Sequence, residues 1–151
     1  MTNYSSLLAD NKIRSEPAVK GQVRGQLAAA TRDLKTAHKL GAEDAWAFSI
    51  AYNAMLHARR AVMFSEGYRP TSGERGHVAV VEFLRIRLDS SFAPLIDVLD
   101  RMRRQRHRLT YESEVAVSKS QTEAAIRTAA NFVDRIEAEL GSTDQRKPKR
   151  E

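Results

Sequence analysis

The sequence predicts an all-α fold, an up-and-down helical bundle of four to five helices. Three observations carry this prediction: apolar residues recur at helical spacing in successive stretches, glycine and proline are sparse, and β-branched runs are short. The chain has 151 residues, which suffices for one domain with a single hydrophobic core. Since 42% of the residues are apolar and only 7% are aromatic, we expect a core of aliphatic side chains and alanine.

The first two helices are expected over residues 18–40 and 43–65. In the first, Val23 and Leu27 begin a regular apolar spacing, and Gly41 is a suitable stop. The second helix carries apolar residues around nearly its whole circumference, which is typical of the central helix of a bundle. One thin polar line interrupts that surface, formed by Ser49, Asn53, His57 and Arg60.

Three further helices complete the expected bundle. A shorter helix over 76–88 follows a glycine-rich loop and carries closely spaced valines and a phenylalanine. The next is expected over 91–111, with Ser91 as its N-cap. The last is expected over 119–140, where apolar residues again recur at helical spacing before Gly141 ends the helix.

Both ends of the chain are expected to lie outside the bundle of residues 18–141. Residues 1–17 are polar and mixed, but Leu7 and Ile13 allow a short helix that docks on the core. Residues 142–151 are charged and contain no apolar residue, which predicts a disordered tail because nothing there can be buried.

Composition limits the classes of function. The formal net charge is +6 and the isoelectric point is near 9.9, which permits a polyanion partner such as RNA or DNA. The chain has no cysteine, which excludes disulfides, cysteine-ligated zinc and thiol catalysis. No histidine pair lies three or four residues apart, so we expect no metal and no cofactor. No leader or membrane-spanning run is recognisable, and a soluble cytoplasmic protein without membrane contact is expected.

The most informative segment lies near the end of the fourth expected helix, where five arginines and a histidine crowd into residues 101–108. A step of about 100° per residue places Arg106 within the apolar stripe of that helix, with Arg103 and His107 at its edge. A charge in line with an apolar stripe needs a partner or a function. The remaining arginines point away from the stripe, namely Arg101, Arg104 and Arg108.

Arg106 and His107 are candidates for phosphodiester chemistry. A guanidinium binds phosphate through two parallel hydrogen bonds and stabilises charge that develops during cleavage. A neighbouring histidine can act as the general acid or base for a ribose 2′-hydroxyl. The simpler alternative is a structural ion pair from Arg106 to Glu82 or Asp134, with His107 as an ordinary surface residue.

The polar line of the second helix is a candidate for the other wall of the same site. Polar side chains on a largely buried helix must be hydrogen-bonded or line a groove. Asn53 and His57 would then face Arg106 across one groove. The alternative is that they are satisfied polar groups of the core and that Arg60 marks the end of the helix.

Three segments resemble the HEPN domains, the "higher eukaryotes and prokaryotes nucleotide-binding" helical domains. Residues 52–70 resemble the second helix and following loop of that family, 76–84 its next helix, and 103–112 its arginine-rich signature. The resemblance extends over roughly residues 19–140. It implies a four- to five-helix bundle that commonly homodimerises, with the signature arginines meeting at a cleft between the subunits.

The resemblance also implies a function. Many prokaryotic HEPN proteins resemble metal-independent endoribonucleases of toxin–antitoxin or defence systems, often paired with a minimal nucleotidyltransferase. Others are non-catalytic modules that bind RNA, nucleotides or a protein partner. We therefore expect a homodimer that acts on RNA, either as a ribonuclease or as the non-catalytic subunit of a nucleotidyltransferase pair.

The family's signature is an arginine, often followed by a polar residue, and a histidine further along the helix. Arg106 and His107 fit the arginine–polar pair, but Tyr111 then stands where the pattern has its histidine. An alignment from Arg101 to His107 fits the spacing instead. The expected catalytic residues are Arg106, His107 and, as an auxiliary, Tyr111. The expected RNA- or nucleotide-binding residues are Asn53, His57, Arg60, Arg101 and Arg103.

Overall fold

The computed structural model describes residues 4–71, 74–111 and 117–146, without the side chains of 74–77, 110–111 and 142–146. Its helices are α1 (Ser5–Ala9), α2 (Gln22–Leu40), α3 (Ala45–Ser65), α4 (Glu74–Arg87), α5 (Ala93–Tyr111) and α6 (Lys119–Arg146). A 3-10 turn, η1 (Ser90–Phe92), precedes α5, and two short strands, β1 (Ile13–Ser15) and β2 (Tyr68–Pro70), form a small sheet. The predicted all-α helical bundle is confirmed, with this sheet as an addition.

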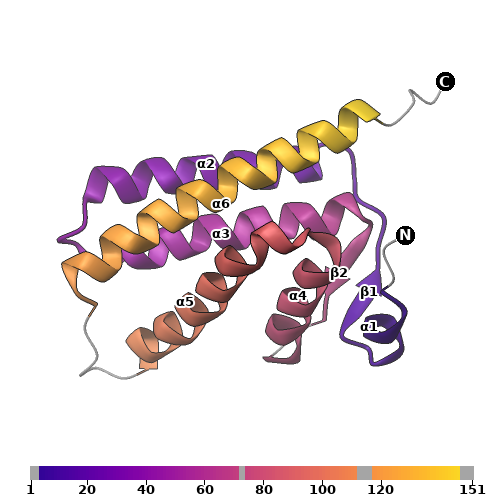
Figure 1. The fold of residues 1–151 in the computed structure, drawn as a ribbon, viewed down its shortest axis with the longest axis horizontal. Coiled ribbons are helices and arrows are strands. Elements are labelled where there is room, and N and C mark those ends of the chain that lie inside the picture. Colours follow the sequence, from indigo (N-terminus) through magenta and orange to yellow (C-terminus); the bar gives the residue numbers. More distant parts are fainter. Residues whose placement is uncertain (1–3, 72–73, 112–116, 147–151) are drawn as a thin grey trace.

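The central helix is α3, as its apolar circumference predicts. Figure 1 shows α2, α3 and α6 running along the long axis, whereas α4 and α5 lie on the other side of α3. Helix α3 contacts all four of these helices and β2. Small side chains let the neighbouring helices approach closely. Five fully buried alanines of α3 have this role: Ala47, Ala51, Ala54, Ala58 and Ala61.

Several element boundaries differ from those expected. Helix α2 begins at Gln22 rather than near residue 18, because Gly21 adopts a left-handed conformation with φ 83°. The fourth expected helix begins with η1, capped by the Asp89 carboxylate, which accepts from the Ser91 amide at 2.8 Å. Ser91 is therefore not the N-cap. Helix α4 begins two residues early, at Glu74.

Helix α6 also departs from expectation at its C-terminal end. It passes through Gly141 and ends at Arg146. The predicted stop at Gly141 is therefore wrong, because a helical glycine costs only about 1 kcal/mol relative to alanine and does not force an end. The expected disordered tail is wrong for 142–146, whose backbone is helical, and residues 147–151 lie outside the described part of the chain.

The N-terminal residues form a strap that the sequence pattern does not reveal in full. Leu7 of α1 is buried, and the Tyr4 ring stacks on Phe83 of α4 with centroids 4.3 Å apart. The Lys12 ammonium lies 3.2 Å from the Glu82 carboxylate. Strand β1 pairs antiparallel with β2, so that Ile13 lies opposite Pro70. The strap thus fastens the start of the chain to the connection between α3 and α4.

A partly buried arginine joins three elements at the other end of α4. The guanidinium of Arg87 bonds to Glu66, the C-cap residue of α3, and to Glu139 of α6 at 3.2 Å. Burial lowers the pKa of Arg87, but the hydrogen bonds and charges of the two carboxylates outweigh it and raise the pKa above its ordinary value. None of the helices in the described part of the chain is long and apolar enough to cross a membrane.

Candidate nucleic-acid interface on α5

The C-terminal half of α5 presents a basic surface. Arg101, Arg104 and Arg108 are exposed, which confirms the outward direction that helix phasing predicts for them. Arg103 and Arg106 are half-buried, in agreement with their predicted place near the apolar stripe. His107 is exposed rather than half-covered at the edge of the stripe. A row of cations along one helix face is the arrangement that attracts a phosphate backbone.

Arg106 is directed at the central helix. The carbon atom of its guanidinium lies 5.3 Å from the centroid of the Tyr52 ring, which is within the range of a cation–π interaction. Tyr52 is only 2% exposed, so its ring is a fixed platform. The expected alternative partner Glu82 is engaged by Lys12. Contact with the aromatic face orients the guanidinium on the side of α5 that faces α3.

A second arginine of this region, Arg59 of α3, is not among the residues that we expected from the sequence. It is 5% exposed, which is rare for an arginine. The pKa of Arg59 is lowered to about 10, chiefly by burial and in smaller part by the charges of Arg60 and Arg103, whereas Tyr52 acts in the opposite direction. The usable signal in the sequence was its position, because Arg59 lies one helical turn beyond Met55 on the apolar circumference of α3.

Tyr52 and its arginines form one electrostatic unit, which we call the α3–α5 cluster: Tyr52, Arg59, Asp100, Arg103 and Arg106. Burial raises the pKa of the Tyr52 hydroxyl, although the charges of Arg59, Arg106 and Arg103 act against this rise. The phenol is therefore protonated at neutral pH. Asp100 lies 3.3 Å from Arg103 and 3.8 Å from the exposed Arg104. Three guanidiniums share this unit with one carboxylate, so the cluster carries an excess of positive charge.

The cluster also fixes how α5 runs relative to α3. The charge of Arg103 lowers the pKa of Arg59. Arg106 follows Arg103 by one turn on α5 and lies over Tyr52, which precedes Arg59 by two turns on α3. The two helices are therefore antiparallel at this contact. The basic end of α5 points to the end of the bundle at which α3 begins, as Figure 1 shows.

The polar line of α3 does not form the second wall of a groove with Arg106. The Nδ1 atom of His57 lies 2.7 Å from the Gln26 side-chain oxygen, and its Nε2 atom lies 3.4 Å from the Asp33 carboxylate. Both partners belong to α2, on the side of α3 away from α5. The prediction that His57 faces Arg106 is wrong, because the ring lies about 140° around α3 from Tyr52. Asn53 is half-buried and Arg60 is exposed.

The environment of His57 gives a pH-dependent prediction. Burial lowers the pKa of His57 below its ordinary value of 6.5, and the charges of Arg60 and Arg32 act in the same direction, against that of Asp33. The unfolded chain therefore takes up a proton at a higher pH than the folded one, and stability falls as the pH drops through 6.5. We expect the thermal midpoint, followed by circular dichroism, to fall less between pH 7.5 and 5.5 in His57→Gln. Parallel profiles would contradict this assignment.

Two further observations bear on the expected site. The backbone of Tyr111 ends α5, but its side chain lies outside the described residues, so its auxiliary role stays a prediction. Within the described part of the chain, no group of three or more histidine, aspartate or glutamate side chains is placed to hold a metal ion.

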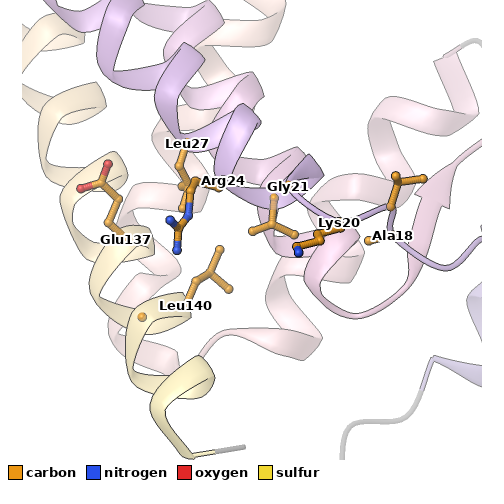
Figure 2. A pocket seen from close by; sticks show the side chains of 10 residues that line it. Ala18, Lys20, Gly21, Arg24, Leu27, Glu137 and Leu140 are labelled. Carbon is orange, nitrogen blue, oxygen red and sulfur yellow. The ribbon is translucent and has the colours of Figure 1, made fainter. Parts of the chain in front are cut away.

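A cavity lies elsewhere in the molecule, between the start of α2 and the late turns of α6. Its volume is about 670 Å³. Figure 2 shows Arg24 and Glu137 on its walls and the apolar side chains of Leu27 and Leu140 between them. It is separate from the basic half of α5, which lies at the other end of α3.

Comparison with known families identifies the fold. The model of the HEPN domain matches residues 23–139, most of the chain. This chain belongs to the HEPN family. The matched segment of this HEPN protein includes the whole α3–α5 cluster, and membership indicates a nucleotide- or RNA-related function. Searches of the curated proteins and of the solved structures gave no significant match.

Proposed function

We propose that this HEPN protein binds RNA along the basic half of α5 and cleaves it as a metal-independent endoribonuclease. The observation that carries the proposal is the position of Arg106, whose guanidinium is held over the buried ring of Tyr52 on a helix whose opposite face carries the exposed Arg101, Arg104 and Arg108. Orientation by the ring reduces the side-chain freedom that Arg106 loses on binding, and its planar guanidinium can bind a phosphate through two hydrogen bonds. Arg101 and Arg103 would bind neighbouring phosphates.

The proposed reaction is an internal transesterification of the RNA chain. His107 accepts the proton of a ribose 2′-hydroxyl, whose oxygen attacks the adjacent phosphorus while Arg106 stabilises the charge on the non-bridging oxygens. The bond from phosphorus to the 5′-oxygen breaks, which yields a 2′,3′-cyclic phosphate and a 5′-hydroxyl. The leaving oxygen needs a proton, and Tyr111, one turn after His107 on the same helix, is the proposed donor.

We further propose that the protein acts as a homodimer, in which the α5 surfaces of two copies form one cleft. The family commonly dimerises, and a second subunit would place another His107 near the scissile bond. A toxin–antitoxin pairing with a minimal nucleotidyltransferase fits the same arrangement, because such a partner would restrain a ribonuclease that acts on cellular RNA.

The test is an RNA cleavage assay in EDTA, with the termini of the products identified. We expect cyclic phosphate ends from the unchanged protein and no cleavage from Arg106→Ala. Arg104→Ala is the matched control, because it removes an exposed arginine of the same helix. Equal losses from Arg104→Ala and Arg106→Ala would show that the helix contributes charge alone, and absence of cleavage under all conditions would overturn the enzymatic proposal.

One observation favours a second candidate function, a non-catalytic subunit that binds RNA or a nucleotidyltransferase. His57 is engaged by α2, so the described part of the α5 surface has a single histidine, His107. This candidate predicts RNA binding or co-purification of a nucleotidyltransferase without the appearance of cyclic phosphate ends.

A further inference from the structure

One aromatic side chain among those that the structure describes is exposed to solvent. Trp46 is 70% exposed, whereas all other aromatic side chains that the structure describes are buried or half-buried. The backbone at this position is fixed, because the main-chain N–H of Trp46 donates to the Asp44 carboxylate at 2.9 Å, which caps α3. An exposed indole on a rigid, capped helix end exposes a large flat apolar face to solvent.

Trp46 belongs to a line of side chains along α3. Asn53 and Arg60 follow it at intervals of seven residues, and both are accessible. Seven residues are about two helical turns, so the three lie on one face and are spaced by about 10 Å. Counted at about 100° per residue, this line lies about 80–120° around α3 from Tyr52, on the face that includes His57. The antiparallel α5 carries its basic half toward the end of α3 at which the line begins (Figure 1).

We propose that Trp46 is a stacking platform for an unpaired base of the bound RNA. This inference rests on the proposed function and adds a place on the exposed face of α3 at which a base is held. Stacking on an aromatic ring suits any base and is the usual way in which proteins hold single-stranded RNA. Asn53 can then bond to a base edge and Arg60 to a phosphate further along the strand.

The charge of the chain favours RNA, a polyanion, as the occupant of this line, because the chain carries a net charge of +6. Arg60 is exposed on the line itself, and His38 and Lys39 stand in the last turn of α2, directly before the turn that leads into α3. That turn also carries Glu43, which pairs with Lys119 at 3.6 Å, and Asp44, which caps α3.

The first measurement uses the protein's own fluorescence, because Trp46 is its single tryptophan. Binding of a labelled single-stranded oligoribonucleotide is followed by anisotropy and, in parallel, by tryptophan emission. We expect the RNA to quench Trp46 and inorganic polyphosphate to bind without quenching. Binding of RNA that leaves the emission unchanged would overturn the inference while the proposed function stands. No binding by anisotropy would overturn the proposed function itself.

The second measurement uses variants. Trp46→Ala should weaken RNA binding by about 5- to 150-fold, which corresponds to the loss of one stacked base, and Trp46→Phe should weaken it less. The salt dependence of binding should stay unchanged in Trp46→Ala, since no phosphate contact is lost, but should become shallower in Arg60→Ala. Val19→Ala is the matched control, because Val19 is 72% exposed at the distant start of α2.

Two results would overturn the stacking role. One is an affinity of Trp46→Ala equal to that of Val19→Ala. The other is a change of oligomeric state in Trp46→Ala, measured by sedimentation at fixed protein concentration, because it would assign the indole to an interface between copies of the chain.

Discussion

Replacing Arg106 by alanine is expected to lower the rate of RNA cleavage by about 10²–10³-fold, the effect of removing one preorganised donor from a developing oxyanion. The fold should persist, because Arg106 is only half-buried and lies over Tyr52 at the rim of the core. Arg106→Lys should recover only part of the rate, since an ammonium keeps the charge but cannot bind two phosphate oxygens in a fixed plane.

Single-turnover cleavage with saturating protein is the measurement, because it separates the chemical step from RNA binding. His107→Ala should lose about 10²–10⁴-fold in the same assay, the usual contribution of a general base. The double variant should be scarcely slower than the worse single variant, because residues that act on one transition state are not additive. Arg108→Ala, an exposed neighbour, is the control. A rate for Arg106→Ala similar to that of Arg108→Ala would contradict the assignment.

Replacing Arg59 by methionine is expected to stabilise the protein by about 1–3 kcal/mol and to weaken its action on RNA. The pKa of Arg59 is lowered from 12.5 to about 10, which corresponds to about 3 kcal/mol of unfavourable burial at neutral pH. The sign follows from linkage. The folded-state pKa lies below the unfolded one, so the penalty is complete below about pH 10 and diminishes as the pH rises above it. Methionine fills a similar volume without the charge.

Urea unfolding at pH 7.5 measures the first effect, and RNA affinity by anisotropy measures the second. Arg60→Met is the matched control for the stability measurement, one residue further on α3 and exposed, and its stability should change by less than about 0.5 kcal/mol. A gain in stability together with weaker RNA binding would show that the buried charge is retained for function. A loss of stability would show that the contacts of Arg59 outweigh the penalty of its burial.

The order and type of the long helices followed from sequence periodicity, because each of them buries one face against α3. The place of Arg106 followed in the same way, from counting 100° per residue along α5. The contact partners of these side chains could not be predicted from periodicity. Periodicity says which face of a helix is covered but not by which neighbour, and so His57 was assigned to the α5 side although it binds Gln26 and Asp33 of α2.

Other features depend on energies that a local pattern does not express. The strap requires β1 to meet β2 across more than fifty residues of chain, and a three-residue strand has no reliable signature of its own. Gly141 is a weak stop that the long apolar face of α6 overrides. Arg59 was overlooked because its neighbours on α3 are apolar, and the apolar circumference of α3 gives no sign that Trp46 is 70% exposed.

The strap has a consequence for where the boundary of the folded domain lies. The stretch shared with the HEPN family starts at residue 23, yet Tyr4 and Ile13 belong to the same continuous core as Phe83. We therefore expect the cooperative unfolding unit to be larger than the segment that matches the HEPN family. A domain boundary placed at residue 23 would remove part of the hydrophobic core. It would expose the face of the Phe83 ring on which Tyr4 stacks and leave strand β2 without β1, its hydrogen-bonding partner.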